Sequence, residues 1–309
     1  MRLGVLDVGS NTVHLLVVDA YHGAHPWPAY SEKAELRLAE KIGDDGKLSR
    51  SGADSLVDAV AKARDAAARH ETEDLLAFAT SAVRDATNSM AVLRRVRDET
   101  GVDLQVLSGE AEAIMTFLAV RRWFGWSAGR LLVLDIGGGS LELASGIDEE
   151  PDAAMSLPLG AGRMTREILK GDPPSPASVE RLREYADAQV AKAASKIADS
   201  GWEKPVATSK TFRTLARLAG AAPSAAGPRA HRRLTRTGLH QVLAFIRRMP
   251  SSALAEIDGV SAGRAHQILA GGIVAEAAMR GLGVDEVEIC PWALREGVIL
   301  RRLDVLEST

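Results

Sequence analysis

Two stretches of the chain share one pattern: LGVLDVGSNT at residues 3–12 and LLVLDIGGGS at residues 131–140. Each begins with an apolar run typical of a buried strand, continues through an aspartate, and ends in a glycine-containing turn. Further apolar runs at 13–18 and 141–144 predict a second strand after each turn. Asp7 aligns with Asp135 at an offset of 128 residues, which is about the length of one domain. The repeat therefore predicts a duplicated fold with a binding site between its halves.

The two turns have the composition of phosphate-binding loops. Glycines let the backbone approach a ligand and direct N–H groups toward it, while short polar side chains add donors. The candidate phosphate-binding residues are Gly9, Ser10, Asn11 and Thr12 in the first turn and Gly137, Gly138, Gly139 and Ser140 in the second. Asp7 and Asp135 could hold Mg²⁺, because this cation prefers oxygen ligands. The alternative is two hairpin turns with capping carboxylates, which the pairing of the loops disfavours.

The rest of the chain alternates strand-like and helix-like segments, which indicates an α/β fold. The hydrophobic spacing predicts strands at 75–79 and 104–107. It predicts helices at 54–70, from residues 80–86 to Gly101, from about Glu110 onward, and at 177–198, 235–248 and 262–280. We expect a domain boundary near residues 126–130, which gives domains of residues 1–126 and 127–309.

The composition excludes several classes of protein. A net charge of −3 and 4% aromatic residues disfavour a protein that coats nucleic acid or stacks on its bases, so no nucleic-acid partner is expected. No apolar run is long enough to span a membrane, and Asp7 interrupts the first one, so no membrane association is expected. The single cysteine, Cys290, cannot form an internal disulfide and indicates a reducing cytoplasm; its simplest role is a small buried side chain.

The near-neutral total conceals an uneven distribution of charge. From Lys204 to Ala255 the chain has ten Lys and Arg residues and no acidic residue, leaving 28 basic and 41 acidic residues elsewhere. A localised basic region can attract a polyanion without making the whole surface cationic. The alternative is an ordinary solvated face.

Together with the two loops, three segments carry a family resemblance: Thr80–Ala86 (TSAVRDA), Ser108–Ala113 (SGEAEA) and Leu294–Gly297 (LREG). The chain resembles the short members of the exopolyphosphatase / guanosine pentaphosphate phosphatase family, within the actin-like ATPase superfamily, over essentially its whole length. The resemblance implies two ribonuclease-H-like domains with an active-site cleft between them. It also implies hydrolysis of a terminal phosphoanhydride and assembly as a homodimer.

The resemblance assigns roles to particular residues. Glu112 matches the family's catalytic glutamate, which positions and deprotonates the attacking water, and Arg84 matches an arginine that contacts the terminal phosphate. Asp135 and Glu142 match the region that holds Mg²⁺, to which Asp7 is added as a third candidate ligand. By their chemistry alone, Glu112 could merely favour the start of its helix, and Arg84 could be an exposed helix arginine.

Two departures from the family pattern favour inorganic polyphosphate as substrate. Lys210 stands where relatives have a glycine in a loop at the nucleoside-binding position, and His266 stands where relatives often have an aspartate. A long cationic side chain suits a phosphate better than a nucleoside. A surface or packed position is the simpler expectation for His266. We expect the downstream phosphates to be held by Lys210, Arg229, Arg232, Arg233 and Arg236.

The sequence therefore predicts a Mg²⁺-dependent exopolyphosphatase that releases orthophosphate from the end of inorganic polyphosphate. The nearest alternative is a guanosine pentaphosphate 5′-phosphatase, which could use the same groups. A different class is a catalytically weak sensor that binds polyphosphate or alarmone, and a sugar kinase of the same superfamily is a third alternative.

Overall fold

The structure is a computed structural model that describes residues 1–21, 26–197 and 201–307. Contacts between Cα atoms divide the chain into two compact units. Unit 1 contains Met1–Met115 together with the segment from Leu294 onward, and unit 2 contains Thr116–Ala293. No helix among the described residues is both long and apolar enough to cross a membrane.

Unit 1 is built on a five-stranded sheet in the order β3-β2-β1-β4-β5. The strands β1, β2 and β3 pair antiparallel, whereas β4 pairs parallel with both β1 and β5. The strands are β1 (Arg2–Val8), β2 (Thr12–Asp19), β3 (Trp27–Glu35), β4 (Asp74–Ala79) and β5 (Gln105–Val106). The helices are α1 (Arg50–Arg69), α2 (Ser81–Arg84), α3 (Ser89–Thr100), the first part of α4 (Gly109–Phe124), α11 (Leu294–Glu307) and the 3-10 turn η1 (Leu38–Lys41).

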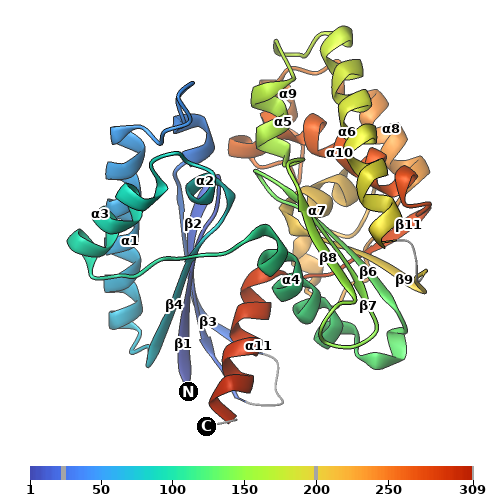
Figure 1. The fold of residues 1–309 in the computed structure, drawn as a ribbon. Coiled ribbons are helices and arrows are strands. Elements are labelled where there is room, and N and C mark those ends of the chain that lie inside the picture. The colour runs from blue at the N-terminus through green and yellow to red at the C-terminus, as the bar shows by residue number, and fades with distance from the viewer. Residues whose placement is uncertain (22–25, 198–200, 308–309) are drawn as a thin grey trace. The chain divides into compact units, whose positions relative to one another are not determined.

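Alternation of side chains along β1 creates two apolar faces in unit 1. Leu6 and Val8 belong to the core under α1 and α3, whereas Leu3 and Val5 belong to a second core that includes Ile299 of α11. Figure 1 shows α1 and α3 on one side of this sheet and α11 on the other. The C-terminal helix therefore completes the sheet that the N-terminal strand begins.

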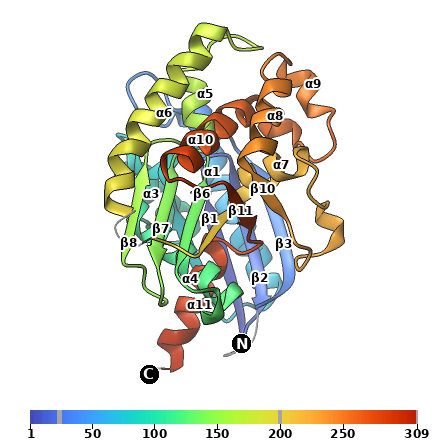
Figure 2. The same ribbon diagram turned by 90° about the vertical axis from the view of Figure 1, so that its right-hand side faces the viewer.

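Unit 2 is built on a six-stranded sheet in the order β10-β11-β9-β6-β7-β8. Its strands are β6 (Leu131–Ile136), β7 (Leu141–Gly146), β8 (Ala153–Leu157), β9 (Lys204–Thr208), β10 (Arg233–Thr235) and β11 (Glu286–Ile289). Its helices are α5 (Ala161–Glu167), α6 (Pro176–Ile197), α7 (Ser209–Leu218), α8 (Arg236–Ile246), α9 (Ser251–Ala255) and α10 (Ile268–Gly281), with 3-10 turns η2 (Trp126–Ala128), η4 (Ser224–Ala226) and η5 (Ala262–Gln267). The apolar α10 packs against α5, α6, α7 and α8 in the main core of this unit (Figure 2).

The duplication predicted from the two loops is confirmed by the sheet topology. The run β8-β7-β6-β9-β11 in unit 2 repeats the order and the strand directions of β3-β2-β1-β4-β5 in unit 1. The α/β class is confirmed as well.

Two of the predicted helices are interrupted. The helix expected to run on to Gly101 consists of α2 and α3, because the side chain of Asn88 between them bonds both the N–H and the C=O of Leu48. The helix predicted at 262–280 begins as the 3-10 turn η5 before α10. The strand predicted at 104–107 is reduced to the two residues of β5.

The compact units differ from the predicted domains 1–126 and 127–309 in two respects. The division falls inside α4, between Met115 and Thr116, and the segment from Leu294 onward joins the first unit. The second difference arises because α11 buries Ile299 and Leu303 against the sheet of unit 1. The domain limits and the cleft expected from the sequence stay predictions.

Candidate functional site

The two glycine loops close with the same backbone hydrogen bond. The N–H of Gly9 donates to the carbonyl of Thr12 at 3.0 Å, and the N–H of Gly137 donates to the carbonyl of Ser140 at 2.9 Å. Each loop therefore turns its chain from one antiparallel strand into the next in the same way, as the repeat predicted. The loop residues Ser10, Asn11, Gly139 and Ser140 are buried, while Gly9, Thr12, Gly137 and Gly138 are half-buried.

Each loop is also held by the helix that packs beside it. In unit 1 the hydroxyl oxygens of Ser10 and Ser81 lie 2.8 Å apart, which ties the loop to the first residue of α2. In unit 2 the N–H of Arg163 in α5 donates to the carbonyl of Gly138 at 2.9 Å. These contacts leave the loops little freedom, as suits backbone groups that must hold a ligand in one geometry.

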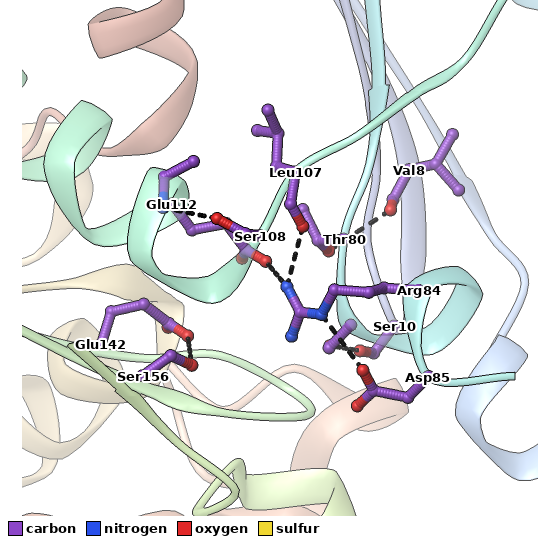
Figure 3. A network of polar contacts seen from close by, with 12 residues as sticks. Val8, Ser10, Thr80, Arg84, Asp85, Leu107, Ser108, Glu112, Glu142 and Ser156 are labelled. Atoms are coloured by element: carbon purple, nitrogen blue, oxygen red, sulfur yellow. Dashed lines mark hydrogen bonds and ion pairs between the residues drawn. The ribbon is translucent and has the colours of Figure 1, made fainter.

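The predicted residues Arg84 and Glu112 form an ion pair within unit 1 (Figure 3). Glu112 is only 7% exposed, and Arg84 also donates to the carbonyl of Leu107 at 3.0 Å and contacts Asp85 at 3.1 Å. Burial lowers the pKa of Arg84, but the carboxylates of Glu112 and Asp85 outweigh it, so its pKa is raised above the ordinary value. The guanidinium therefore keeps its charge throughout the working pH range.

The start of α4 separates two glutamates that are two residues apart in the sequence. The hydroxyl of Ser108 accepts from the N–H of Ala111 at 3.1 Å, which caps the helix. Glu112 then lies in the first turn, where the helix dipole favours a carboxylate, and its side chain is buried. Glu110 is exposed, as expected. The chain therefore offers a matched pair of acids, one in the site and one in solvent.

The LREG segment at 294–297 packs closely against α4. A Cβ atom at Gly297 of α11 would lie 1.8 Å from the backbone carbonyl oxygen of Met115, one turn beyond Glu112. Only glycine allows the two helices to approach this closely. This close contact gives the segment a structural role: it fixes the helix that carries Glu112.

Strand register places a second polar side chain beside each loop aspartate. In unit 2 Asp135 on β6 is directly opposite Glu142 on β7, and in unit 1 Asp7 on β1 is directly opposite His14 on β2. Opposed residues of antiparallel strands share a face, with Cβ atoms about 5 Å apart. Glu142 is buried and accepts from the hydroxyl of Ser156 at 2.9 Å.

The carboxylates of Asp135 and Glu142 fit a hard divalent cation. Like charges opposed across two strands are unfavourable, and a cation between them would remove that cost. Mg²⁺ is commonly held by one or two carboxylates together with substrate phosphates, so two acids suffice. No group of three or more His, Cys, Asp or Glu side chains that could hold a metal occurs among the described residues. The two acids beside the second loop could therefore hold Mg²⁺ together with other oxygen ligands, such as waters and phosphate oxygens.

The acid-free segment 204–255 meets acids of other segments in the folded chain. Arg233 lies 3.1 Å from Glu286 and Arg236 lies 2.8 Å from Asp285, because β10 pairs antiparallel with β11. The local excess of positive charge is therefore smaller than the sequence count indicates.

Arg232 supports the loop that precedes it. Its guanidinium donates to four backbone carbonyls between residues 222 and 230, at distances from 2.7 to 3.1 Å. Arg229 lies in this loop and is exposed. Arg232 thus fixes the segment that presents Arg229.

The two departures from the family pattern, Lys210 and His266, lie in α7 and η5. Lys210 is exposed at the second residue of this helix. His266 is half-buried in η5, and its Nε2 lies 3.1 Å from Nε2 of Gln267. This half-buried position is intermediate between the surface and packed positions expected for His266.

Comparison with known proteins gives the family. A model of the Ppx/GppA phosphatase family matches residues 17–306. The chain belongs to this family. Exopolyphosphatase 1 of Mycobacterium tuberculosis is 61% identical over 305 residues, which cover 98% of this chain and 89% of that relative. A guanosine-5′-triphosphate,3′-diphosphate pyrophosphatase of Vibrio parahaemolyticus is 28% identical and matches 98% of this chain but 59% of its own length.

Solved structures of the Ppx/GppA family have the same fold. The crystal structure of an exopolyphosphatase from Cytophaga hutchinsonii aligns with a TM-score of 0.89 at 24% identity, covering 99% of this chain and 98% of that one. An Aquifex aeolicus Ppx/GppA phosphatase aligns with a TM-score of 0.80 at 26% identity, over 97% and 99% of the two chains. The predicted class, α/β with two actin-like domains, is therefore confirmed.

The sequence analysis did not single out His14, which lies opposite Asp7 in the first hairpin. The 128-residue offset that aligns Asp7 with Asp135 also aligns His14 with Glu142, so the repeat contained the signal. His14 is 5% exposed and its Nε2 lies 2.8 Å from the hydroxyl of Ser31. Its Nδ1 is buried with no hydrogen-bond partner among the described residues.

Proposed function

We propose that the protein is an exopolyphosphatase that hydrolyses the terminal phosphoanhydride of inorganic polyphosphate and releases orthophosphate. The observation that carries the proposal is the ion pair of Arg84 with the buried Glu112, in the same unit as the Gly9–Thr12 loop. The 61% identity to a relative named Exopolyphosphatase 1 supports the choice of substrate.

In the proposed reaction Glu112 accepts a proton from a water molecule whose oxygen attacks the terminal phosphorus. The bond between that phosphorus and the bridging oxygen breaks, and the shortened chain leaves with the bridging oxygen as an anion. Glu112 then releases its proton to solvent. Arg84 binds oxygens of the terminal phosphate and stabilises the charge that develops on them.

The glycine loops supply backbone N–H groups that bind phosphate oxygens. We assign Mg²⁺ as the cofactor, with Asp135 and Glu142 as its ligands and Asp7 as a further candidate. When bound, the cation would neutralise phosphate charge and polarise the leaving group. The protein's own contribution is to hold these carboxylates beside a fixed loop.

We assign the downstream phosphates to Lys210, Arg229, Arg232, Arg233 and Arg236. The ion pairs of Arg233 and Arg236 are exposed, and such pairs contribute only about 0–1 kcal/mol. A polyanion can therefore exchange with Glu286 and Asp285 at little cost. Arg232 would act indirectly, by holding the loop of Arg229.

The test is orthophosphate release from polyphosphates of defined length and from guanosine pentaphosphate, by wild type, Glu112→Gln and Glu110→Gln. Loss of a general base lowers kcat by about 10²–10⁴-fold. We expect that loss for Glu112→Gln and none for the exposed Glu110→Gln. Equal activity of the two variants would remove Glu112 from the mechanism.

The rate of orthophosphate release from guanosine pentaphosphate distinguishes the proposed exopolyphosphatase from a guanosine pentaphosphate 5′-phosphatase. Faster release from this nucleotide than from any polyphosphate would make it the primary substrate. Binding of either ligand without release by the wild type would instead identify a sensor.

Two further parts of the proposal are a cytoplasmic location and assembly as a homodimer. The lone, buried Cys290 suits a reducing compartment. Sedimentation of the purified chain and fractionation of cells measure the two properties directly.

A further inference from the structure

Unit 2 contains a pocket at the start of α7, where η5 and the first turn of α10 adjoin it. It encloses about 300 Å³ of space, part of which is open to solvent. About 20 Å³ of this space can be entered by groups the size of water, and a cavity needs about 10–15 Å³ to hold one water. The pocket is therefore sized for a small group.

The lining combines buried neutral donors with cations. Thr211, Thr214 and Gln267 are 6%, 6% and 4% exposed, whereas Lys210 is exposed and Arg264 is half-buried. None of the described lining residues is acidic. The hydroxyl of Thr214 donates to the carbonyl of Gly259 and the amide of Gln267 contacts His266, so the two cations and the hydroxyl of Thr211 are the groups that make the lining complementary to an anion.

A close approach of α10 and a sharp turn before α7 form this pocket. A Cβ atom at Gly271 of α10 would lie 2.5 Å from the methyl group of Thr211 and 3.2 Å from Ala161, so glycine lets α10 close the back of the pocket. The chain turns sharply at Ser209, whose φ of 81° is unusual for a residue with a side chain. This turn starts α7 and sets Lys210 and Thr211 in its first turn.

The rest of the lining is mostly apolar, and the two cations come from different elements. Val260 and Ile268 are apolar, and Ser261 is an exposed hydroxyl at the edge. Arg264 is on η5 and Lys210 is on α7, so the two cations come from different elements. An anion bound by both would connect those elements.

We propose that this pocket binds a phosphate group other than the one that is hydrolysed, with Lys210 and Arg264 as its cationic ligands. The inference rests on the proposed function for the source of that phosphate, which is a downstream unit of polyphosphate. A phosphate of a nucleotide has the same chemistry, and the experiment separates the two sources. Arg264, Gln267 and Thr211 thereby join the substrate-binding residues, which the sequence alone had not indicated.

The experiment measures binding without turnover. Isothermal titration of the full-length Glu112→Gln protein uses orthophosphate, tripolyphosphate, long-chain polyphosphate and GTP as ligands. Lys210→Gln and Arg264→Gln are added singly and together. Arg248→Gln is the matched control, because Arg248 is an exposed cation of the same acid-free segment that does not line the pocket.

We expect each pocket variant to weaken binding of long-chain polyphosphate about tenfold or more, the size of one lost charge-assisted hydrogen bond. Arg248→Gln should change it less than about twofold, as expected for a screened surface charge. A larger effect on long-chain polyphosphate than on GTP supports the polyphosphate source. An effect confined to GTP overturns that source.

Effects of Lys210→Gln and Arg264→Gln no larger than that of Arg248→Gln would overturn the pocket assignment. Thermal unfolding of each variant confirms that the fold is retained, and both cations are at least partly exposed, so their replacement leaves the core intact. Orthophosphate release by the wild type is a separate measurement. The binding measurements therefore test the pocket assignment, and orthophosphate release by the wild type separately tests the proposed hydrolysis.

Discussion

The β1–β2 hairpin of unit 1 and the β6–β7 hairpin of unit 2 share a loop hydrogen bond and a strand register, but they differ in charge beside the loop. Asp7 is opposed by the imidazole of His14, whereas Asp135 is opposed by the carboxylate of Glu142. An opposed pair of acids repels, while an acid and an imidazole do not. A bound cation would therefore relieve more charge repulsion in the second hairpin than in the first.

The far ends of the two hairpins differ as well. In unit 1, Arg2 and Asp19 form an ion pair at 2.8 Å near the surface. In unit 2, the fully buried Arg121 donates to the carbonyls of Gly125, Gly129 and Gly146, the last of these at the end of β7. The second hairpin also has an ion pair near the surface, between Arg130 and Asp152, so the difference is the buried guanidinium of Arg121.

The largest effect is expected at Arg121. Arg121→Met removes the donor to one buried carbonyl, of Gly146, and to two part-buried ones, of Gly125 and Gly129. An unsatisfied buried group costs about 1–3 kcal/mol, so we expect a loss of that size in the free energy of unfolding, measured by urea denaturation. Arg121→Lys should recover little, because an ammonium lacks the planar fork.

Arg2→Met is the matched control for Arg121→Met. The Arg2–Asp19 pair lies near the surface, where water and salt screen it, so its loss should destabilise the protein much less than the loss of Arg121. Equal destabilisation by the two substitutions would show that the hairpin ends do not differ in the way described.

The second prediction concerns Glu142. Its replacement should have opposite effects on thermal stability in the absence and in the presence of Mg²⁺. In EDTA, Glu142→Gln should raise the thermal midpoint, because it removes a like-charge pair while its amide can still bond Ser156. Added Mg²⁺ should stabilise Glu142→Gln less than it stabilises the wild type. The affinity of the variant for Mg²⁺ should be about 10–100-fold lower, the range for disturbed metal sites. Titration of the midpoint with MgCl₂ measures both effects.

His14→Gln provides the comparison in unit 1. It replaces the residue equivalent to Glu142 without altering a carboxylate, so the Mg²⁺-dependent shift should stay close to that of wild type. If Mg²⁺ stabilised both variants to the same extent, the assignment of the cation to the second hairpin would fail.

The smallest effect is expected at Asp19. The hydrogen bond from Arg2 lowers the pKa of this carboxyl below its ordinary value. A lowered pKa in the folded state stabilises the protein above the ordinary pKa, near pH 4, and this contribution is lost as the pH falls through the folded-state pKa. Asp19→Asn should therefore lower stability slightly at pH 7 and have less effect at pH 3.

Urea midpoints at the two pH values measure this difference, and added salt should reduce it because the pair is exposed. A difference between wild type and Asp19→Asn that grew toward acid pH would contradict the assigned sign.

Local pattern was sufficient to predict the hairpins. The apolar runs that contain Asp7 and Asp135 predicted the strands and the glycine turns after them, and their repetition predicted the duplicated topology. The pairing of Arg84 with Glu112 needed the family resemblance, because 28 residues separate two side chains that only the fold brings together.

Long-range pairing explains what the sequence did not reveal. The acids that neutralise Arg233 and Arg236 lie about 50 residues away and reach them only because β10 pairs with β11. The interruption between α2 and α3 depends on the backbone of Leu48, some 40 residues earlier than Asn88. The pocket around Lys210 likewise needs Arg264 from another segment.

The position of α11 in the chain has a consequence for synthesis. A ribosome delivers β1 and Glu112 early, yet the helix that covers their sheet and contacts Met115 comes after all of unit 2. Unit 2 can form from continuous chain while the first sheet still has an uncovered face. The unit that holds Glu112 therefore receives its last core helix only after all of unit 2 has been synthesised.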